Sequence, residues 1–442
     1  MNRKVTWVVS CVLATVSFIL SACAPPAATP APRLPAAAKV PAQPTAEGGV
    51  TIRWRTRADT QDEQAVYQAI NDELNQKLQG QGVHVQYDPA PAQGYRDKLI
   101  DEHTTDNAPD IVWVDGAAMA DFASKGVALD LKPLADADHT FKLSDYYDAP
   151  LKELEHGGQL WGLPGDISTL VMYYNKDLFR AKGLEDPADL VAKGQWNWET
   201  FRQAALALTD PSAKQYGFTM NDEWSPWGWF VMSGGGSLYN AERTICNLTD
   251  PGSIRGLRFM ADLFLKDRVG PSPSAQGESD FHAGSVAMFP NGRWMTSRMR
   301  QDKFDWGVVE MPEGPAGKKT WLFWNPYLIS SRTRYPQQAW LVLKELMSPP
   351  VQARLAALGN SMPSSKDKAA LDAFLNSRPP ADNTPFMTGI DYAQAETALF
   401  TASFDAVNMA YQTAIDRILA DRATPDEAAS QACDKANPLF RK

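Results

Sequence analysis

Residue types that usually carry out chemistry are scarce in this chain. Only 5 of its 442 residues are histidine and only 4 are cysteine. Neither a His-Glu-x-x-His nor a Cys-x-x-Cys motif occurs, so the sequence predicts no metal site. No Gly-x-Ser-x-Gly motif of a hydrolase is present, and the glycines of segment 314–320 are too close together for a phosphate-binding loop. We expect that segment to be a surface turn, and we expect no cofactor, metal or catalytic residue.

An excess of basic residues is also missing. Lysine and arginine number 43 against 52 acidic residues, a net charge of −9, which argues against a nucleic-acid partner. Beyond the N-terminal segment, no apolar run approaches the roughly 20 residues of a membrane span. A hydrophobic content of 44% and a charged content of 21% are typical of globular proteins. The roughly 390 residues after position 49 suffice for two domains of about 100–200 residues each.

The first 23 residues have the pattern of an export signal. Arg3 and Lys4 precede an apolar run over residues 5–20, and Ser21 and Ala22 then lead to Cys23. The run is too short, and too rich in serine and threonine, for a comfortable membrane span. Small residues that end on a cysteine resemble the bacterial lipobox, in which the cysteine is lipidated and becomes the mature N-terminus. The alternative is an ordinary signal peptide that is cut nearby.

The segment that follows favours the lipoprotein interpretation. Residues 23–49 consist mostly of alanine and proline, with too little apolar surface to fold. A proline-rich chain extends by about 3.1 Å per residue, so this tether could hold a domain about 60–80 Å from its anchor. A tether that begins at a cysteine makes sense when that cysteine is attached to something. We therefore expect residues 1–22 to be a lipoprotein signal peptide and Cys23 to anchor the protein outside the cytoplasm.

Two cysteines remain for the folded part of the chain. Cys11 lies in the signal and Cys23 is the lipidation candidate, which leaves Cys246 and Cys433. In an oxidising compartment these two thiols can pair. Two free, buried cysteines are the alternative, and the sequence leaves both open.

The mature part opens with alternating strands and helices. Residues 50–54 predict a strand, and a capping box of Thr60 and Glu63 begins a helix that Gly80 ends. Residues 83–87 alternate as a second strand, and a short helix follows around residues 95–99. The apolar run 109–114 is typical of a parallel strand with both faces buried. This order predicts an α/β domain whose ligands lie at the carboxyl ends of the strands, at residues 54–59 and 115–116.

Helices dominate the rest of the chain. Apolar residues at helical spacing, with proline or capping residues at the starts, mark these segments. We expect helices over 198–208, 250–264, 337–347, 404–418 and from 424 onward.

Several segments in order resemble one known family. The chain resembles the extracellular solute-binding proteins of bacterial ABC importers, in the carbohydrate-binding branch that includes maltose-binding protein. The resemblance covers nearly the whole mature chain. The segments that carry it are 108–113, 170–179, 183–184, 198–201, 281–288, 292–294, 335–340 and 406–440.

The resemblance implies a periplasmic-binding-protein-like α/β fold, with two α/β lobes joined by a multi-strand hinge of the class II type. Lobe 1 would comprise residues 50–168 plus 325–361, and lobe 2 residues 169–324 plus 362–442. A small-molecule ligand, with a sugar favoured, would sit between the lobes and close them by hinge motion. The implied partners are the membrane permease subunits of an ABC importer, and we expect a monomer.

Aromatic residues are the first candidates for ligand contact, because a sugar needs flat apolar surfaces against its C–H faces. Trp294 lies where the family places a stacking aromatic, at a strand-to-helix turn. Trp224 and Trp227 belong to the densest tryptophan cluster, for which core packing is the alternative. Trp324 and Asn325 replace the small, often glycine-rich segment of the family, which suggests a small ligand with an added stacking face.

Polar candidates would surround the hydroxyl rim. Asp166 and Asp115 each follow or flank a predicted strand, although either could instead cap a turn. Arg293 departs from the small or proline residue common in the family, and suggests an acidic sugar or else an internal salt bridge. Arg57 and Asp59, at the end of the first strand, are weaker candidates because solvated surface explains them equally well.

Two other functions stay open at this point. An exported carbohydrate-active enzyme would use Asp166 and Asp115 as an acid and base pair, although no catalytic motif supports it. A sensor subunit coupled to signalling is the other. The solute could also be a polyol, a glycerol phosphate or a peptide, and Arg293 keeps a negatively charged ligand open.

Overall fold

The computed structural model describes residues 49–58, 60–91, 93–105 and 107–440. The predicted signal peptide, Cys23 and nearly all of the tether lie outside the described residues, as does the candidate Asp59. Among the helices within these ranges, none combines the length and the apolar character that crossing a membrane requires.

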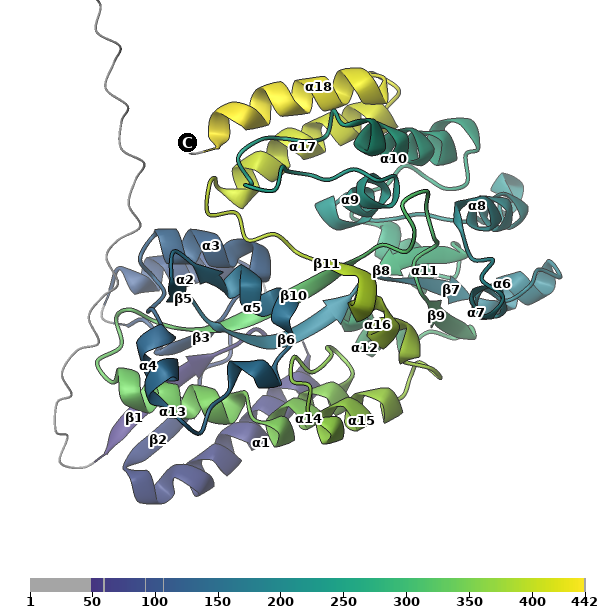
Figure 1. Cartoon of the computed structure of the whole chain (residues 1–442). Helices are drawn as coiled ribbons and strands as arrows, with labels where there is room; N and C mark the ends of the chain where they lie inside the picture. The colour runs from purple at the N-terminus through teal and green to yellow at the C-terminus, as the bar shows by residue number, and fades with distance from the viewer. Residues whose placement is uncertain (1–48, 59, 92, 106, 441–442) are drawn as a thin grey trace, which may run out of the picture. The chain divides into compact units, whose positions relative to one another are not determined.

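The N-terminal part forms the predicted parallel strands (Figure 1). β1 (Val50–Arg55) pairs in parallel with β2 (Val83–Tyr87) and with β3 (Ile111–Trp113). α1 (Gln61–Leu78) connects β1 to β2 and begins at the Thr60–Glu63 capping box, while α2 (Tyr95–His103) connects β2 to β3. The odd residues of β2 are buried and the even residues are exposed, as the alternation predicts. The strand–helix order and the capping box are confirmed.

Two long antiparallel strands join this sheet to a second one. Within the described residues, the first sheet has six strands in the order β11-β10-β3-β1-β2 with β6 on β10, and the second has three in the order β8-β7-β9. β10 (Thr320–Ile329) pairs with β3 at its C-terminal end and with β11 (Ala393–Ala395) at its N-terminal end. β6 (Leu163–Thr169) pairs along β10 and continues after Leu170 into β7 (Val171–Asn175) of the second sheet. β8 (Met288–Asn291) and β9 (Trp306–Val309) flank β7.

Helices cover both sheets. Figure 1 shows α1, α13, α14 and α15 along one face of the six-stranded sheet, with α2, α3 and α5 along the other. The helices of the first part are α3 (Gly116–Ser124), α4 (Lys132–Ala137), α5 (Asp148–Leu154), α13 (Pro336–Leu346) and α14 (Pro349–Leu358). Those around the second sheet are α6 (Lys176–Ala181), α7 (Pro187–Ala192), α8 (Trp198–Ala207), α9 (Trp224–Ser233), α10 (Pro251–Ala261), α11 (Gly277–His282), α12 (Thr296–Met299), α17 (Phe404–Leu419) and α18 (Pro425–Ala436). α15 (Lys368–Asn376) and α16 (Thr384–Gly389) lie between β10 and β11 in the chain.

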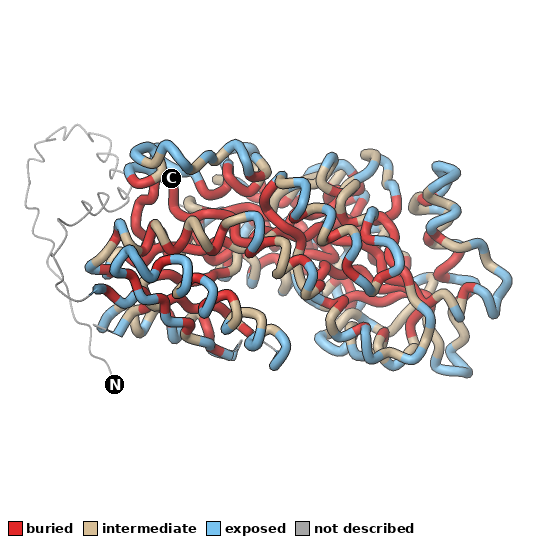
Figure 2. Tube along the Cα trace, turned by 90° about the horizontal axis from the view of Figure 1, so that it is seen from below, coloured by how far each residue is buried: buried red, intermediate tan, exposed pale blue. Residues whose placement is uncertain are grey.

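Buried apolar side chains form two clusters that meet near the crossing strands. The first surrounds the six-stranded sheet and includes Trp54 and Leu322, and the second lies among α8, α9, α10, α17 and α18 and includes Trp229 and Tyr411. Figure 2 shows buried segments running through the interior and exposed residues along the outside of the molecule. Fully burying one such side chain is worth about 1.5–3 kcal/mol relative to leaving it exposed. The exact lobe boundaries stay a prediction. Phe374 and Phe386, which that prediction assigns to lobe 2, pack in the first cluster.

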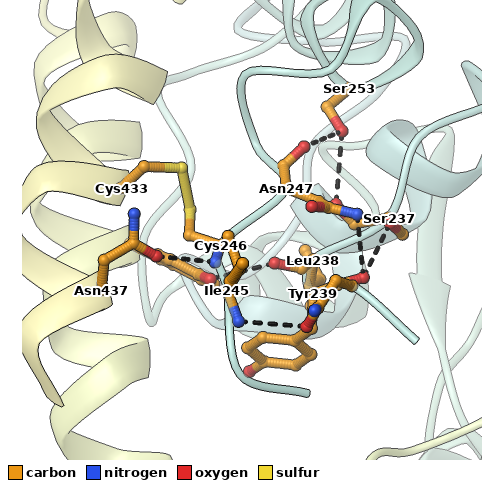
Figure 3. Close-up of a disulfide and its surroundings, with 11 residues drawn as sticks. Ser237, Leu238, Tyr239, Ile245, Cys246, Asn247, Ser253, Cys433 and Asn437 are labelled. Carbon is orange, nitrogen blue, oxygen red and sulfur yellow. Dashed lines mark hydrogen bonds between the residues drawn. A yellow bond between two sulfur atoms is a disulfide. The ribbon is translucent and has the colours of Figure 1, made fainter. Parts of the chain in front are cut away.

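The two remaining cysteines are paired. Cys246, in the loop after α9, and Cys433, on α18, form a disulfide across 187 residues of sequence (Figure 3). The side chain of Asn437 accepts a hydrogen bond from the Cys246 backbone N–H at 2.8 Å. Of the two alternatives that the sequence leaves open, the disulfide is the correct one. It ties a loop of the second sheet's region to the C-terminal helix.

Candidate functional site

The pairing of β6 with β10 gathers polar and aromatic side chains on one face. Asp166 lies opposite Asn325 and Ser168 lies opposite Phe323 in the antiparallel register. Opposed residues of an antiparallel pair point to the same side of the sheet, and so do residues two positions apart. These four side chains therefore share a face where the chain passes between the two sheets. We call this face and the side chains packed around it the strand-crossing site.

Asp166 is the central polar group of the strand-crossing site. Its Oδ1 accepts a hydrogen bond from Asn325 Nδ2 at 2.8 Å, and its Oδ2 accepts one from Trp113 Nε1 at 3.1 Å. Burial raises the pKa of Asp166 to about 6, against the opposing effect of these two hydrogen bonds and of Arg57. The side chain keeps partial exposure. A partly exposed carboxylate held by two fixed donors is pre-oriented to accept further hydrogen bonds.

Two arginines and Asp115 extend the polar region. The Arg57 guanidinium lies 5.1 Å from the centroid of the Trp113 ring and 3.8 Å from Asp115 Oδ1. Arg96 Nε donates to Asp115 Oδ2 at 3.0 Å. Asp115 occupies the N-cap position of α3, but its side chain makes no capping hydrogen bond. The carboxylate thus meets the arginines at the carboxyl end of β3, where the strand order predicted ligand-binding groups.

An exposed tryptophan forms the aromatic part. Trp294, in the short turn that follows β8, is 39% exposed, which is unusual for so large an apolar side chain. Its ring makes an edge contact with Phe323 at 5.0 Å between centroids. Gly292 permits this position, because a Cβ at that residue would lie 2.1 Å from the indole. Trp224, half-buried at the start of α9, contacts Phe323 at 6.0 Å and Phe404 at 5.8 Å. Phe323 thus connects both indoles to the row that contains Asn325.

Three of the predicted ligand contacts are buried and engaged inside the protein in this structure. Trp227 is fully buried and donates through Nε1 to Gln412, and Trp324 is fully buried and donates to the Glu396 carbonyl at 2.9 Å. Arg293 is buried too. Its guanidinium donates to Ser377 Oγ at 2.9 Å and lies 5.4 Å from the ring centroids of both Phe374 and Phe386.

Burial lowers the pKa of Arg293 to about 10. A ligand that touched Trp227, Trp324 or Arg293 would have to enter a packed core. The strand-crossing site brings together Arg57, Asp115, Asp166, Trp224, Trp294 and Asn325 of the predicted residues, whereas Asp59 falls outside the described part of the chain.

Sequence reasoning missed Trp113, Phe323 and Arg96. Two features of the sequence could have identified Trp113 and Phe323. Trp113 ends the strand that precedes Asp115, and Phe323 is two residues from Asn325 on one strand. Arg96 sits on a helix with no motif that sets it apart. No group of three or more histidine, cysteine or acidic side chains suited to a metal ion occurs among the described residues.

The sequence comparisons identify the family. The profile described as bacterial extracellular solute-binding protein matches residues 46–381 of this chain. The chain belongs to this family. A binding protein of Brucella abortus is 21% identical over 372 residues, which is 82% of this chain and 87% of that protein. A maltooligosaccharide ABC transporter solute-binding lipoprotein of Streptococcus pneumoniae is 24% identical over 250 residues, 54% of this chain and 55% of that protein.

Solved structures of solute-binding proteins share the fold. An ABC substrate-binding protein of Listeria monocytogenes, in complex with cycloalternan, superposes with a TM-score of 0.79 at 21% identity and covers 88% of this chain and 98% of its own. A cyclic alpha-maltosyl-1,6-maltose binding protein of Arthrobacter globiformis superposes with a TM-score of 0.75 at 20% identity, over 89% and 99%. The predicted fold, two α/β lobes with a multi-strand hinge, is confirmed, and the solute-binding family is extracellular.

The raised pKa of Asp166 makes stability depend on pH in a defined direction. Its ordinary value is 3.8 and its folded value is about 6, so between these values the folded protein binds the extra proton. The contribution of Asp166 to the free energy of unfolding therefore falls as pH rises through this window. We expect Asp166→Asn to gain about 2–3 kcal/mol relative to the wild type between pH 4 and pH 7. Urea denaturation of the unliganded proteins measures this difference, and a pH-independent difference contradicts the account.

Proposed function

We propose that this chain is a lipid-anchored receptor that binds a sugar or oligosaccharide in a cleft between its lobes and delivers it to an ABC importer. The observation that carries the proposal is the exposed ring of Trp294 packed against Phe323, on the strand that also bears Asn325. An exposed indole next to fixed carboxylate and amide groups suits a ligand with both apolar faces and hydroxyl groups.

Each part of the strand-crossing site has a counterpart on such a ligand. Trp294 offers a flat apolar surface for the C–H face of a sugar ring, and Trp224 offers a second one. Asp166 accepts hydrogen bonds from hydroxyl groups, and Asn325 holds that carboxylate in place through the 2.8 Å hydrogen bond. The Arg57 guanidinium, 5.1 Å from the centroid of the Trp113 ring, can donate to hydroxyl oxygens. A site built to hydrogen-bond hydroxyl groups rejects analogues that lack them, because its buried polar groups are then left unpaired.

The crossing strands also offer a route from binding to transport. Because β6 and β10 pass between the two sheets, a ligand that contacts groups of both lobes favours the arrangement in which the lobes are close together. A ligand shifts such an equilibrium only by contacts that the open form lacks. The closed form would be recognised by the permease subunits of the importer, with the receptor as a monomer.

The known relatives support a carbohydrate ligand. The Streptococcus pneumoniae relative is named for maltooligosaccharide, and the Listeria monocytogenes structure contains cycloalternan. The buried position of Arg293 removes the main argument for an acidic ligand, since its guanidinium packs against two phenylalanine rings and donates to Ser377 Oγ inside the protein.

No specific observation favours an enzyme over a receptor. Asp115 is paired with Arg96, so Asp166 and Asp115 do not form the free acid and base pair that an enzyme would need. Turnover of any candidate glycan by the purified protein would overturn the receptor proposal.

A thermal-shift screen of the mature protein against a sugar library tests ligand binding. A ligand that binds only the folded state raises the melting temperature by mass action. We expect Trp294→Ala to abolish the shift for the best sugar, because it removes the exposed stacking surface, and to leave the unliganded melting temperature nearly unchanged. Met409→Ala, which truncates another exposed side chain, on α17, serves as the control and should keep the shift.

Two results would count against this role for Trp294. A variant that keeps the full ligand-induced shift shows that the indole does not contact the sugar. A variant whose unliganded melting temperature falls by many degrees shows that the ring is a structural core residue.

Membrane anchoring through Cys23 has its own test. We expect the wild-type protein, expressed in a bacterium with its complete N-terminus, to remain in the membrane fraction after high-salt washing. Cys23→Ser removes the thiol that would carry the lipid and should leave the protein uncleaved at that position and free of incorporated radiolabelled fatty acid. Cys11→Ser, within the signal, is the matched control. Fatty-acid labelling that persists in Cys23→Ser contradicts the anchor assignment.

A further inference from the structure

The turn that carries Trp294 begins with a completely buried arginine. Arg293 opens the short turn Arg293–Met295 and is 0% exposed, whereas the next residue, Trp294, is 39% exposed. The Arg293 guanidinium donates to Ser377 Oγ at 2.9 Å and lies 3.3 and 3.4 Å from the Pro379 carbonyl oxygen. Its Nε has no hydrogen-bond partner in the described part of the chain, and no acidic side chain there pairs with it. The charge is therefore buried without a carboxylate to balance it.

The stability of the core does not explain an arginine at this position. Removing a cation from water is costly, and a carboxylate partner is what normally offsets that cost. Burial lowers the pKa of Arg293, and the neighbouring cations Arg300 and Arg378 lower it further. An apolar side chain of similar length would fill the space beside Phe374 and Phe386 without burying a charge. Replacing a buried charge by an apolar group is often neutral or stabilising.

Arg293 attaches the turn to two other segments of the chain. Its backbone N–H donates to Ser168 Oγ at 2.8 Å, and Ser168 lies on β6 opposite Phe323 of β10. Its side chain donates to Ser377, and both Ser377 and Pro379 lie between α15 and α16. The turn is thereby fixed to a crossing strand through the backbone of Arg293, and to the α15–α16 connection through the guanidinium.

Trp294 depends on its backbone for its position at the strand-crossing site. The indole Nε1 donates to no residue that the structure describes, so no hydrogen bond of its own fixes the ring. Tyr173 holds the two ends of the turn, because its Oη donates to the Gly292 carbonyl at 2.8 Å and lies 3.0 Å from Thr296 Oγ1. Between these ends, the hydrogen bonds of Arg293 attach the residue before Trp294 to other parts of the chain.

We propose that Arg293 is a positioning residue for ligand binding, which does not touch the sugar and holds the turn so that the Trp294 indole stays in place at the strand-crossing site. The inference rests on the proposed sugar-binding function and adds to it a residue that acts through Trp294. A ring that is already in its binding position loses less conformational entropy when a ligand binds. The buried charge is then kept for affinity at some cost in stability, as functional sites commonly show.

Arg293→Met separates positioning from packing, because methionine is flexible and unbranched and packs well against aromatic rings. The probe is the sugar with the largest wild-type thermal shift in a library that includes maltose, maltotetraose and cellotetraose. We expect calorimetry to show about 5–20-fold weaker binding of this sugar to the variant, because affinity scales with the fraction of molecules whose ring is in place. The unliganded melting temperature should stay the same or rise, because an unpaired buried charge is removed.

Arg202→Met is the matched control. Arg202 on α8 donates to Asp267 at 2.5 and 2.7 Å, and the Asp267 side chain is only 8% exposed. The same substitution there leaves a carboxylate without its cation, so we expect a lower melting temperature and an unchanged affinity for the sugar. If Arg293→Met gives this pattern too, Arg293 has a structural role only and the inference is wrong.

Fluorine NMR of the unliganded protein, labelled with 5-fluorotryptophan, tests the positioning without any sugar. The Trp294 resonance is assigned by its loss in Trp294→Phe. We expect one narrow Trp294 resonance in the wild type, and a shifted resonance that is broadened or split in Arg293→Met. An identical resonance in both proteins shows that Arg293 does not hold the ring and overturns the inference.

Ser377→Ala removes the acceptor of the 2.9 Å hydrogen bond and provides a second variant if Arg293→Met does not fold. We expect it to weaken sugar binding in the same direction, by about 2–5-fold, and to broaden the Trp294 resonance. Wild-type affinity together with a wild-type resonance contradicts the inference and leaves the proposed function standing. If no sugar of the library binds the wild type, the proposed function fails and the role of Arg293 in binding fails with it.

Discussion

The antiparallel pairing of β6 with β10 is the constraint on which the rest of the structure depends. These strands belong to the six-stranded sheet, and β6 runs on directly into the second sheet through β7. The backbone hydrogen bonds between them fix the register that places Asp166 opposite Asn325 and Ser168 opposite Phe323. The groups that we propose to bind ligand are therefore attached to the same strands that connect the lobes. A contact at the strand-crossing site can in this way be coupled to the angle between the lobes.

Some of the residues considered for ligand contact are packed inside the protein, whereas others remain exposed at the strand-crossing site. Arg293, Trp227 and Trp324 make their main contacts inside the protein, and they belong to the packed core around the strand-crossing site. Trp294, by contrast, exposes a large ring to solvent. An exposed apolar surface of this kind marks a place where a protein interacts with something else.

Local patterns in the sequence predicted the framework well, while Trp294 was singled out by the family resemblance and not by any local pattern. The Thr60–Glu63 capping box and the alternation of β2 act over a few residues, so the sequence alone determines them. Trp227 belongs to a helix that is apolar on every side, a pattern that indicates burial and could have excluded it. Trp324 likewise lies within a continuous apolar strand that is covered on both faces. Arg96 offered no signal, because its contact with Asp115 is visible only when the neighbouring elements are in place.

The most direct test of the central claim is a crystal structure of the mature protein with the best-binding sugar from the screen. The account predicts a sugar ring stacked on Trp294, with its hydroxyl groups within hydrogen-bonding distance of Asp166 and residues of both lobes in contact with the ligand. A sugar bound away from the β6–β10 crossing, or one that touches only one lobe, would contradict it.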